Sequence, residues 1–513
     1  MYSVILSCAI QGVLACPVNV EVDVSSGLPG FEMVGMPGGE VKEAKERTRV
    51  ALKNIGFAMP PKKITVNLSP ANLRKNGTSF DLPIAIGILA SMEVIPKKVL
   101  EDMFFMGELS LNGELKFISG VLPGTVMAKQ MGRKTCIVPK CNEMEGASVA
   151  GIRVLGFESL PQIIEFLLSD EKERKKRKGP KIDLKKVMQS SSDEEEDFAE
   201  VHGQAAAKRA AEIAAAGFHH FMMVGPPGGG KTMIAKRIPS ILPPLTLKES
   251  LEVSQIYSIN GMLSAEHPLV LKRPFCAPHH TATEQALIGG GSNPKPGQIS
   301  LAHRGVLFLD EAPHFSKAAL ESLRQPMEEK KIEISRAYAT YSYPADFMLV
   351  IAANPCPCGY FPDRNKCRCT EGEIKRYFAK LSGPIMDRMD LYVATSAVKL
   401  SELSYGAAKE ESSESIRRRI TVARDMQRER FGKAKNAFNG NMSAREIEKY
   451  CILEPQAKVL MEKAYEKLRL GARGYHKILK VARTIADLEK QEVIGAKHLM
   501  EAIGYRFRQS EQG

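Results

Sequence analysis

The feature that most restricts what this chain can fold into is the octapeptide Gly225 to Thr232, which reads GPPGGGKT. Four apolar residues, Phe221 to Val224, precede it and predict a buried strand, and a helix is expected from Met233 to Ile238. Glycines let backbone N–H groups approach a polyphosphate, and the helix N-terminus adds a favourable dipole. A strand, glycine-rich loop, Lys-Thr pair and helix in this order predict a phosphate-binding loop, the alternative being a glycine-rich surface turn.

This loop gives the first candidate site. Lys231 is expected to reach the β- and γ-phosphates of a nucleotide, and the Thr232 hydroxyl is expected to hold Mg²⁺. The predicted nucleotide-binding residues are Gly225, Pro226, Pro227, Gly228, Gly229, Gly230, Lys231 and Thr232.

A second segment carries the carboxylates that nucleotide hydrolysis requires. Val306 to Leu309 is a four-residue apolar run, and Asp310 and Glu311 follow it directly. A buried strand that ends in carboxylates is typical of a Walker B site, in which Asp310 orders Mg²⁺ through water and Glu311 polarises the attacking water. The alternative is an ordinary strand end, but the pairing with the phosphate-binding loop favours ATP and Mg²⁺ as cofactors.

The 513 residues are enough for about two to four domains. Residues 1–170 alternate short strands and helices, which predicts an α+β domain; residues 198–396 hold the nucleotide site and predict an α/β core; residues 397–513 predict a helical lid. The N-terminal prediction rests on strands at 18–24, 64–68 and 135–139, the first of them in a hairpin that begins at Val4, and on helices at 40–55 and 80–91.

The lid prediction rests on helical periodicity over 415–430, 443–450, 455–470, 475–488 and 496–506, and Ser443 with Glu446 predicts a capping box.

Residues 171–197 predict a solvated linker, because a block dense in Lys and Arg is followed by the acidic run QSSSDEEED. The alternative is a basic arm that contacts DNA. Lys and Arg number 72 and Asp and Glu 59, so the net charge is +13, which favours anionic partners without naming one.

We expect a cytoplasmic protein without a membrane span. No window of about 18 apolar residues occurs. Val13 to Cys16 mimics a lipoprotein cleavage site, but Met1 to Ser3 lacks the basic residue of a signal peptide, and Ser7 and Gln11 interrupt its apolar segment. The ten cysteines are therefore expected in a reducing compartment, without disulfides.

The N-terminal domain resembles the proteolytic domain of Lon proteases, in the segments Phe105 to Leu115, Ile118 to Leu122 and Ile137 to Lys140. That family uses a Ser-Lys dyad. Ser79, in Asn76-Gly77-Thr78-Ser79, is similar to the nucleophile segment, but no Lys occurs from Ser119 to Ala128, where the resemblance puts it. A serine hydroxyl without a base is a weak nucleophile, so we expect the fold without the proteolysis and predict Ser79 as a helix N-cap.

The remainder of the chain resembles AAA+ ATPases of the magnesium-chelatase-like branch. The resemblance rests on the two nucleotide motifs and on FAEVHGQ (198–204), RPFCAPHHT (273–281), LRQPME (323–328), AANP (352–355) and LSGPIMDRMD (381–390). With a Lon-like domain in front and helices behind, the chain is similar to the YifB/ComM group over nearly its full length. The resemblance implies a hexameric DNA helicase that promotes branch migration in natural transformation or recombination.

The resemblance also implies roles for three polar residues. Asn354 is expected to be sensor 1, beside the γ-phosphate. Arg388 is expected to be an arginine finger that reaches the nucleotide of a neighbouring subunit, the alternative being a local ion pair with Asp387 or Asp390. Arg473 is expected to be the sensor 2 residue, the alternative being a surface arginine at a helix N-terminus.

Two further sites are candidates. Glu328 to Arg336 resembles a hairpin that faces the central channel in related helicases, so Lys330, Lys331 and Arg336 are candidate DNA contacts, unless the segment is a solvated turn. Cys356, Cys358, Cys367 and Cys369 form two C-x-C pairs that are able to supply four thiolates to a structural Zn²⁺, the alternative being free thiols.

Three functions remain open. The first is an ATP-driven DNA translocase. The second is a chelatase-type ATPase that remodels a partner protein during metal insertion, although that ATPase lacks a Lon-like domain. The third, a scaffold without catalysis, is disfavoured by the intact Lys231, Asp310, Glu311 and Arg388.

Overall fold

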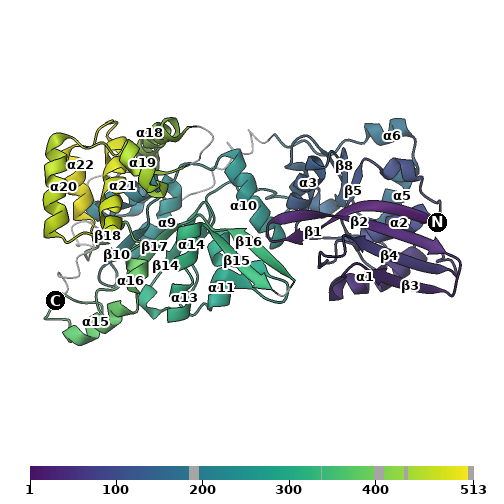
Figure 1. Ribbon diagram of the computed structural model, residues 1–513, viewed down its shortest axis with the longest axis horizontal. Coiled ribbons are helices and arrows are strands. Elements are labelled where there is room, and N and C mark those ends of the chain that lie inside the picture. Colours follow the sequence, from purple (N-terminus) through teal and green to yellow (C-terminus); the bar gives the residue numbers. More distant parts are fainter. Residues whose placement is uncertain (184–195, 337, 398–409, 433–436, 507–513) are drawn as a thin grey trace.

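The computed structural model describes residues 1–183, 196–336, 338–397, 410–432 and 437–506. Two bodies lie side by side along its long axis in Figure 1: residues 1–183 form one, and the remaining described residues form the other. No helix among the described residues is long and apolar enough to cross a membrane.

A four-stranded sheet forms the first half of the N-terminal body. Its strand order is β1-β2-β4-β3, with β1 and β2 joined as an antiparallel hairpin. Apolar side chains alternate with polar ones along β2 and β4, so one face of the sheet is buried. Helix α2 is buried along its whole length against this sheet. The elements are β1 (Tyr2–Gln11), β2 (Leu14–Ser25), β3 (Gly30–Val34), α1 (Gly39–Asn54), β4 (Lys63–Ser69) and α2 (Asp81–Ser91).

A parallel sheet of order β5-β8-β9 and a short β6-β7 ladder complete this body. The expected α+β domain is therefore present. Its remaining strands and α-helices are β5 (Met103–Phe105), β6 (Glu108–Leu109), β7 (Leu115–Lys116), α3 (Val121–Gln130), β8 (Thr135–Pro139), α4 (Glu143–Ala147), β9 (Arg153–Phe157), α5 (Leu160–Leu168) and α6 (Glu171–Lys176).

The second body is built on a parallel sheet of order β11-β14-β17-β10-β18. Strand β10 (Phe221–Val224) lies between β17 (Met348–Ala353) and β18 (Leu391–Ala394), and β14 (Val306–Leu309) lies between β17 and β11 (Phe275–Cys276). Parallel strands place their carboxyl ends at one edge, where α/β proteins bind ligands. The loop after β10 and the carboxylates after β14 therefore meet at the same edge.

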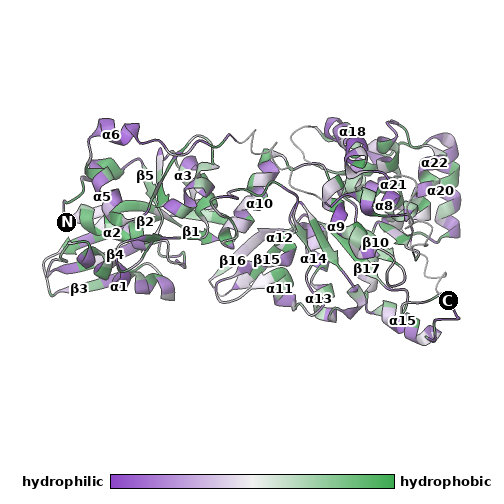
Figure 2. Ribbon diagram, turned by 180° about the vertical axis from the view of Figure 1, so that it is seen from behind, coloured by the Kyte–Doolittle hydropathy of each residue, from purple (hydrophilic) through white to green (hydrophobic). Residues whose placement is uncertain are grey.

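Both faces of this sheet are covered. Phe221 and Met223 of β10 belong to an apolar cluster on one face, and Met222 and Val224 belong to a cluster on the other. Strands that are buried on both faces have sequences of consecutive apolar residues. In Figure 2, β14 and β17 are accordingly mostly green, the colour of hydrophobic residues. The covering elements include α8 (Ala205–Gly217), α9 (Lys231–Ile241), α10 (Leu247–Ile259), α11 (Glu284–Ile288), α12 (Gln298–Leu301), α13 (Lys317–Glu321) and α14 (Arg324–Glu329).

The described part of the C-terminal region, 410–432 and 437–506, is mostly helical, as expected. Their buried residues, such as Ile420 and Val481, share one cluster with Phe221 and Ala211, so these helices pack on the sheet side that α8 and α9 cover. The predicted capping box is confirmed, since Ser443 and Glu446 bond reciprocally at the start of α19. The helices are α18 (Ser413–Phe431), α19 (Ala444–Tyr450), α20 (Pro455–Lys467), α21 (Ala472–Leu488) and α22 (Ala496–Gly504).

One local prediction was wrong. Ser79 is not the N-cap of α2; Phe80 holds that position, and the Ser79 carbonyl accepts a hydrogen bond from Gly107 N (2.9 Å). The predicted solvated linker begins with the short helix α6, which has no buried residue and carries a Lys175–Glu171 ion pair one turn apart. Most of the predicted acidic run lies outside the described residues.

The two bodies contact each other through α3 and α10. Gly120 N donates to the Ser258 carbonyl (3.1 Å), and the Ser258 hydroxyl donates to the buried Glu145 carboxylate (2.5 Å). Leu122, at the start of α3, joins Val149 and Leu269 in a small apolar cluster across the junction. The helix that the Lon resemblance associates with the catalytic lysine is therefore a packing surface. No hydrogen bond among the described residues joins a lysine to the Ser79 hydroxyl.

Candidate nucleotide site and cysteine cluster

The glycine-rich loop lies between a strand and a helix, as the sequence predicts. It leaves β10 at Gly225, whose N–H donates to the Ala353 carbonyl (3.2 Å), and it ends where α9 begins at Lys231. Gly228 and Gly230 have φ of 77° and 71°, and a Cβ at either position would meet no atom within 4 Å. Their left-handed conformation, which favours glycine, turns the loop back toward the N-terminus of α9. This open glycine-rich turn at a helix start fits a polyphosphate.

Lys231 lies beneath this loop. The residue is 8% exposed, and its ammonium donates to the carbonyls of Gly225 (2.7 Å) and Pro226 (2.9 Å) and to Asn354 Oδ1 (3.2 Å). Burial lowers the Lys231 pKa, while the carboxylates of Asp310 and Glu311 oppose that shift. The lysine and the predicted sensor residue are thus joined directly, because β17 lies beside β10.

Oxygen atoms suitable for Mg²⁺ lie at the same edge. The Thr232 hydroxyl donates to Asp310 Oδ2 (2.6 Å), and Glu311 N donates to Asp310 Oδ1 (2.9 Å). Hydroxyl and carboxylate oxygens are the ligands that Mg²⁺ prefers, so the donor set fits that ion. Glu311 has φ of 49°, and its side chain is exposed rather than buried behind the strand. The structure therefore brings Lys231, Thr232, Asp310, Glu311 and Asn354 together.

Arg388 and Arg473 lie elsewhere, on a common patch. Arg388 donates to the Pro384 carbonyl (2.6 Å) and forms an ion pair with Glu328; Arg473 Nη2 lies 3.7 Å from Glu328 Oε1. The sequence analysis considered an ion pair between Arg388 and Asp387 or Asp390 as the alternative to a finger. The carboxylate that Arg388 contacts is instead Glu328, on α14. Arg473 is 74% exposed. Sequence reasoning missed Glu328, because only the tertiary structure brings its helix to these arginines.

A hydroxyl that sequence reasoning also missed lies under the loop. Thr395 follows β18, and a Cβ on Gly225 or Gly229 would come within 2.0 or 3.1 Å of its Oγ1. This oxygen is buried, and no hydrogen-bond partner for it occurs within the described ranges of the chain. Because Thr395 lies so close, there is no room for a side chain at position 225, and glycine is required there.

The hairpin predicted near residue 330 is present, as β15 (Lys331–Arg336) and β16 (Ala339–Pro344). Lys330 precedes it, and Lys330 Nζ lies 3.5 Å from Asp346 Oδ1; Lys331 pairs with Glu333 at the base. Arg336 is exposed near the tip, where its Nε–H donates to the Gly291 carbonyl (3.3 Å). Tyr338, which the sequence analysis did not single out, is 66% exposed beside Arg336, and the Arg74 guanidinium lies 5.8 Å from its ring centroid.

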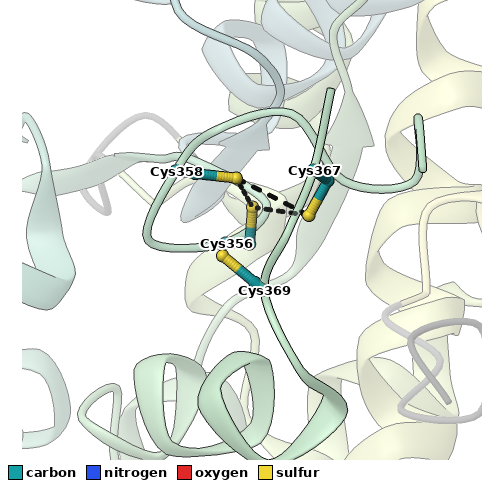
Figure 3. A group of neighbouring side chains, drawn as sticks. All are labelled: Cys356, Cys358, Cys367 and Cys369. Carbon is teal, nitrogen blue, oxygen red and sulfur yellow. Dashed lines mark hydrogen bonds between the residues drawn. The ribbon is translucent and has the colours of Figure 1, made fainter. Parts of the chain in front are cut away.

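The four cysteines of the C-x-C pairs converge (Figure 3). The Sγ atom of Cys356 lies 3.3 Å from that of Cys358 and 3.7 Å from that of Cys367, and all four sulfurs lie within 4.8 Å of one another. A tetrahedral Zn²⁺ with bonds of about 2.3 Å needs sulfurs about 3.8 Å apart. The backbone amide of Tyr360 lowers the pKa of Cys358 to about 6, whereas burial raises the pKa of Cys367, so the case for the ion rests on the positions of the four sulfurs. The cluster fits the ion, and it is the only such group among the described residues.

Comparisons with known proteins agree with these observations. A family model described as "Magnesium chelatase, subunit ChlI" matches residues 197–403, one described as "Magnesium chelatase, subunit ChlI C-terminal" matches 410–506, and one described as "Subunit ChlI of Mg-chelatase" matches 20–142. The competence protein ComM of Haemophilus influenzae is 42% identical over 504 residues, which cover 98% of this chain and 97% of that relative. The chain belongs to the ComM/YifB family.

The uncharacterized protein YifB of Escherichia coli is 41% identical over the same shares of both chains. Lon protease 2 of Bacillus subtilis is 28% identical over 128 residues, which are 25% of this chain and 23% of that protease. These comparisons confirm the predicted magnesium-chelatase-like AAA+ family and the Lon-like similarity at the N-terminus. The family implies ATPase activity that uses Mg²⁺.

Proposed function

We propose that this protein is an ATP-driven DNA translocase that moves branch points in the cytoplasm. The observation that carries the proposal is the convergence of Lys231, Asn354 and the Thr232–Asp310 pair at one sheet edge. The name of the Haemophilus relative, a competence protein, and the basic hairpin support DNA as the substrate that moves.

The chain's own residues divide the ATPase reaction among them. Thr232 and Asp310 would hold Mg²⁺, which neutralises developing phosphate charge. Lys231 binds and orients the phosphates, Glu311 accepts a proton from the attacking water, and Asn354 orients that water beside the γ-phosphate.

We propose that the active unit is a ring, and that six subunits form it. Arg388 and Arg473 support shared sites, because both contact Glu328 rather than the phosphate-binding loop of their own chain. In a ring they would reach the nucleotide of the next subunit, where a guanidinium offsets the charge on the transferred phosphoryl group. The Glu328 contacts must then open on assembly.

We propose Arg336 and Lys331 as the principal DNA contacts of each subunit. Both side chains are exposed, while Lys330 is held by Asp346 and burial lowers its pKa. Contacts of this kind go to the phosphate backbone and carry little sequence information. Tyr338, at the hairpin tip, is placed to stack on an unpaired base.

Removing Lys331 and Arg336 together should weaken DNA binding and its salt dependence. We expect Lys331→Ala/Arg336→Ala to reduce the slope of log affinity against log salt by about 1.4 to 1.8, since each phosphate contact contributes about 0.7 to 0.9. Fluorescence anisotropy with labelled single-stranded and four-way-junction DNA over a range of salt concentrations measures that slope. Lys134→Ala is a matched control, because Lys134 is an exposed lysine paired with Asp102, as Lys331 is with Glu333. An unchanged slope in the double variant would exclude the hairpin as the DNA contact.

We also propose that the four cysteines hold one structural Zn²⁺. Four thiolates that close a tetrahedral site leave no open coordination position, so the ion braces the fold and takes no part in hydrolysis. Elemental analysis of gently purified protein is expected to find about one zinc per chain.

The matched family descriptions favour one alternative, a chelatase-type ATPase that remodels a partner protein. Such a protein hydrolyses ATP without responding to DNA. The response of the ATPase to DNA therefore separates the two functions.

A further inference from the structure

The cysteine cluster lies between the two halves of the proposed ATP site. We call residues 356–369 the cysteine knuckle. It begins two residues after Asn354, at the end of β17, and it ends one residue before Thr370, which caps α15 (Glu371–Ala379). The knuckle contains no helix or strand, and its path is set by isolated turns, in which Gly359 N donates to the Cys356 carbonyl (3.0 Å) and Cys367 N donates to the Asp363 carbonyl (2.8 Å), together with side-chain contacts.

One side of the knuckle packs against the phosphate-binding loop. Gly359 has φ of 86°, and a Cβ at this position would lie 2.7 Å from Pro227 Cδ, 2.8 Å from Pro227 Cγ and 3.9 Å from Asn354 Cγ. Real Cβ atoms do not approach other atoms closer than 3.0 Å, so only glycine allows this contact. The knuckle therefore packs against the loop that would hold the phosphates, and against sensor 1.

The other side of the knuckle rests on α15. Cys356 and Cys367 are buried with Ile374 in one apolar cluster, and Phe378 packs against it. Helix α15 leads through Leu381 into α16 (Gly383–Met386), and Arg388 follows two residues later. A single irregular segment thus connects Pro227, Asn354 and the helices before the proposed finger.

We propose that the metal ion held by the cysteine knuckle fixes Pro227 and Asn354 in their productive positions, so that ATP turnover depends on a zinc site remote from the reacting atoms. This inference rests on the proposed ATPase and zinc site. The ion joins the two ends of the knuckle, residues 356–358 and 367–369, and so removes the conformational freedom of the residues between them. Gly359 follows the first ligand pair directly in the chain and packs against Pro227, so a shift of the knuckle displaces Pro227.

The test measures zinc content and ATP turnover in the full chain. Dialysis against a chelator should remove the zinc and lower kcat/KM for ATP by about 10- to 100-fold, since misplacing a catalytic group by about 1 Å costs up to about 100-fold. Returning Zn²⁺ alone should restore the rate, while Mg²⁺ is kept constant throughout. A normal thermal unfolding transition of the nucleotide core in the metal-free protein would show that the loss is local.

Gly359→Ala tests the contact without touching a ligand. It should keep about one zinc per chain yet reduce kcat/KM by about 10- to 100-fold, because the added methyl displaces Pro227. Gly56→Ala is the matched control: Gly56 has φ of 92°, but a Cβ there meets nothing within 4 Å, so the backbone strain is similar and the contact is absent. This control should retain the wild-type rate.

The outcomes are distinguishable. Zinc well below one per chain in untreated protein would remove the zinc site and this inference with it. Bound zinc with ATP turnover unaffected by its removal, or by Gly359→Ala, would overturn the inference while the zinc site and the ATPase stand. Absence of ATPase activity in the untreated, zinc-loaded protein would instead contradict the proposed function.

Discussion

Glu311→Gln is expected to bind ATP with nearly unchanged affinity and to hydrolyse it about 100- to 10,000-fold more slowly, the range that a positioned general base contributes. In the structure Glu311 lies just beyond the end of β14 with its side chain exposed, and Asp310 accepts a hydrogen bond from the Thr232 hydroxyl. The amide keeps the size of the side chain and removes only its basicity. Nucleotide binding by fluorescence and phosphate release under single-turnover conditions measure the two quantities separately.

Glu266→Gln is the control for this substitution, because Glu266 is an exposed glutamate in a loop of the same body. It should hydrolyse ATP at the wild-type rate. If Glu311→Gln turns over normally, Glu311 is not the base, and another group must activate the water. Loss of binding together with hydrolysis would also contradict the assignment, since Lys231 and the loop remain intact in this variant.

Arg388→Ala should lower the ATPase rate by about 1,000-fold or more, as loss of an arginine finger does in other phosphoryl-transfer enzymes. In the structure its guanidinium contacts Glu328 and Pro384 of its own chain. If the finger acts on a neighbouring site, Arg388→Ala subunits keep an intact phosphate-binding loop, whereas Lys231→Ala subunits keep an intact finger. Mixing the two inactive variants should restore activity, with about a quarter of the interfaces complete at equal amounts if partners assort at random.

Mixed assembly must be verified, for example by co-purification through two different tags. Arg445→Ala, which removes an exposed arginine on α19, should retain full activity alone and in mixtures. Verified mixed rings without recovered activity at any ratio would mean that Arg388 does not complete a neighbouring site. Full ATPase activity of Arg388→Ala alone would show that Arg388 is not an arginine finger.

The nucleotide motifs were predictable from sequence because their geometry is local. A loop that requires positive φ selects glycine at Gly228 and Gly230, and buried parallel strands select uninterrupted apolar runs such as Val306 to Leu309. The convergence of the four cysteines was likewise predictable, since two C-x-C pairs close together in the sequence are able to supply four thiolates to one tetrahedral site. In each case one short segment, or two nearby ones, contains all the necessary information.

Features that depend on distant segments were not predictable. Glu328 precedes Arg388 by 60 residues in the chain, and their ion pair exists because α14 and α16 pack on the same side of the sheet. Ser79 was misjudged for the same reason: the buried Asp81 carboxylate accepts from Arg47 and from Leu109 N, and these contacts fix where α2 begins. The packing of α3 on α10 was not predictable either, since Leu122 meets Leu269 only in the folded chain.

The central claim is that ATP hydrolysis drives movement on branched DNA. The most direct test compares ATP turnover by one preparation with no DNA, with single strands, with duplex and with a four-way junction, while a fluorophore–quencher pair on the junction arms reports branch migration. Our account predicts that the junction raises the ATPase rate above the DNA-free rate, that arm exchange requires ATP, and that Glu311→Gln binds the junction without exchanging its arms. A single ATPase rate under all four conditions, with no junction binding at low salt, would contradict the account and favour the partner-remodelling ATPase.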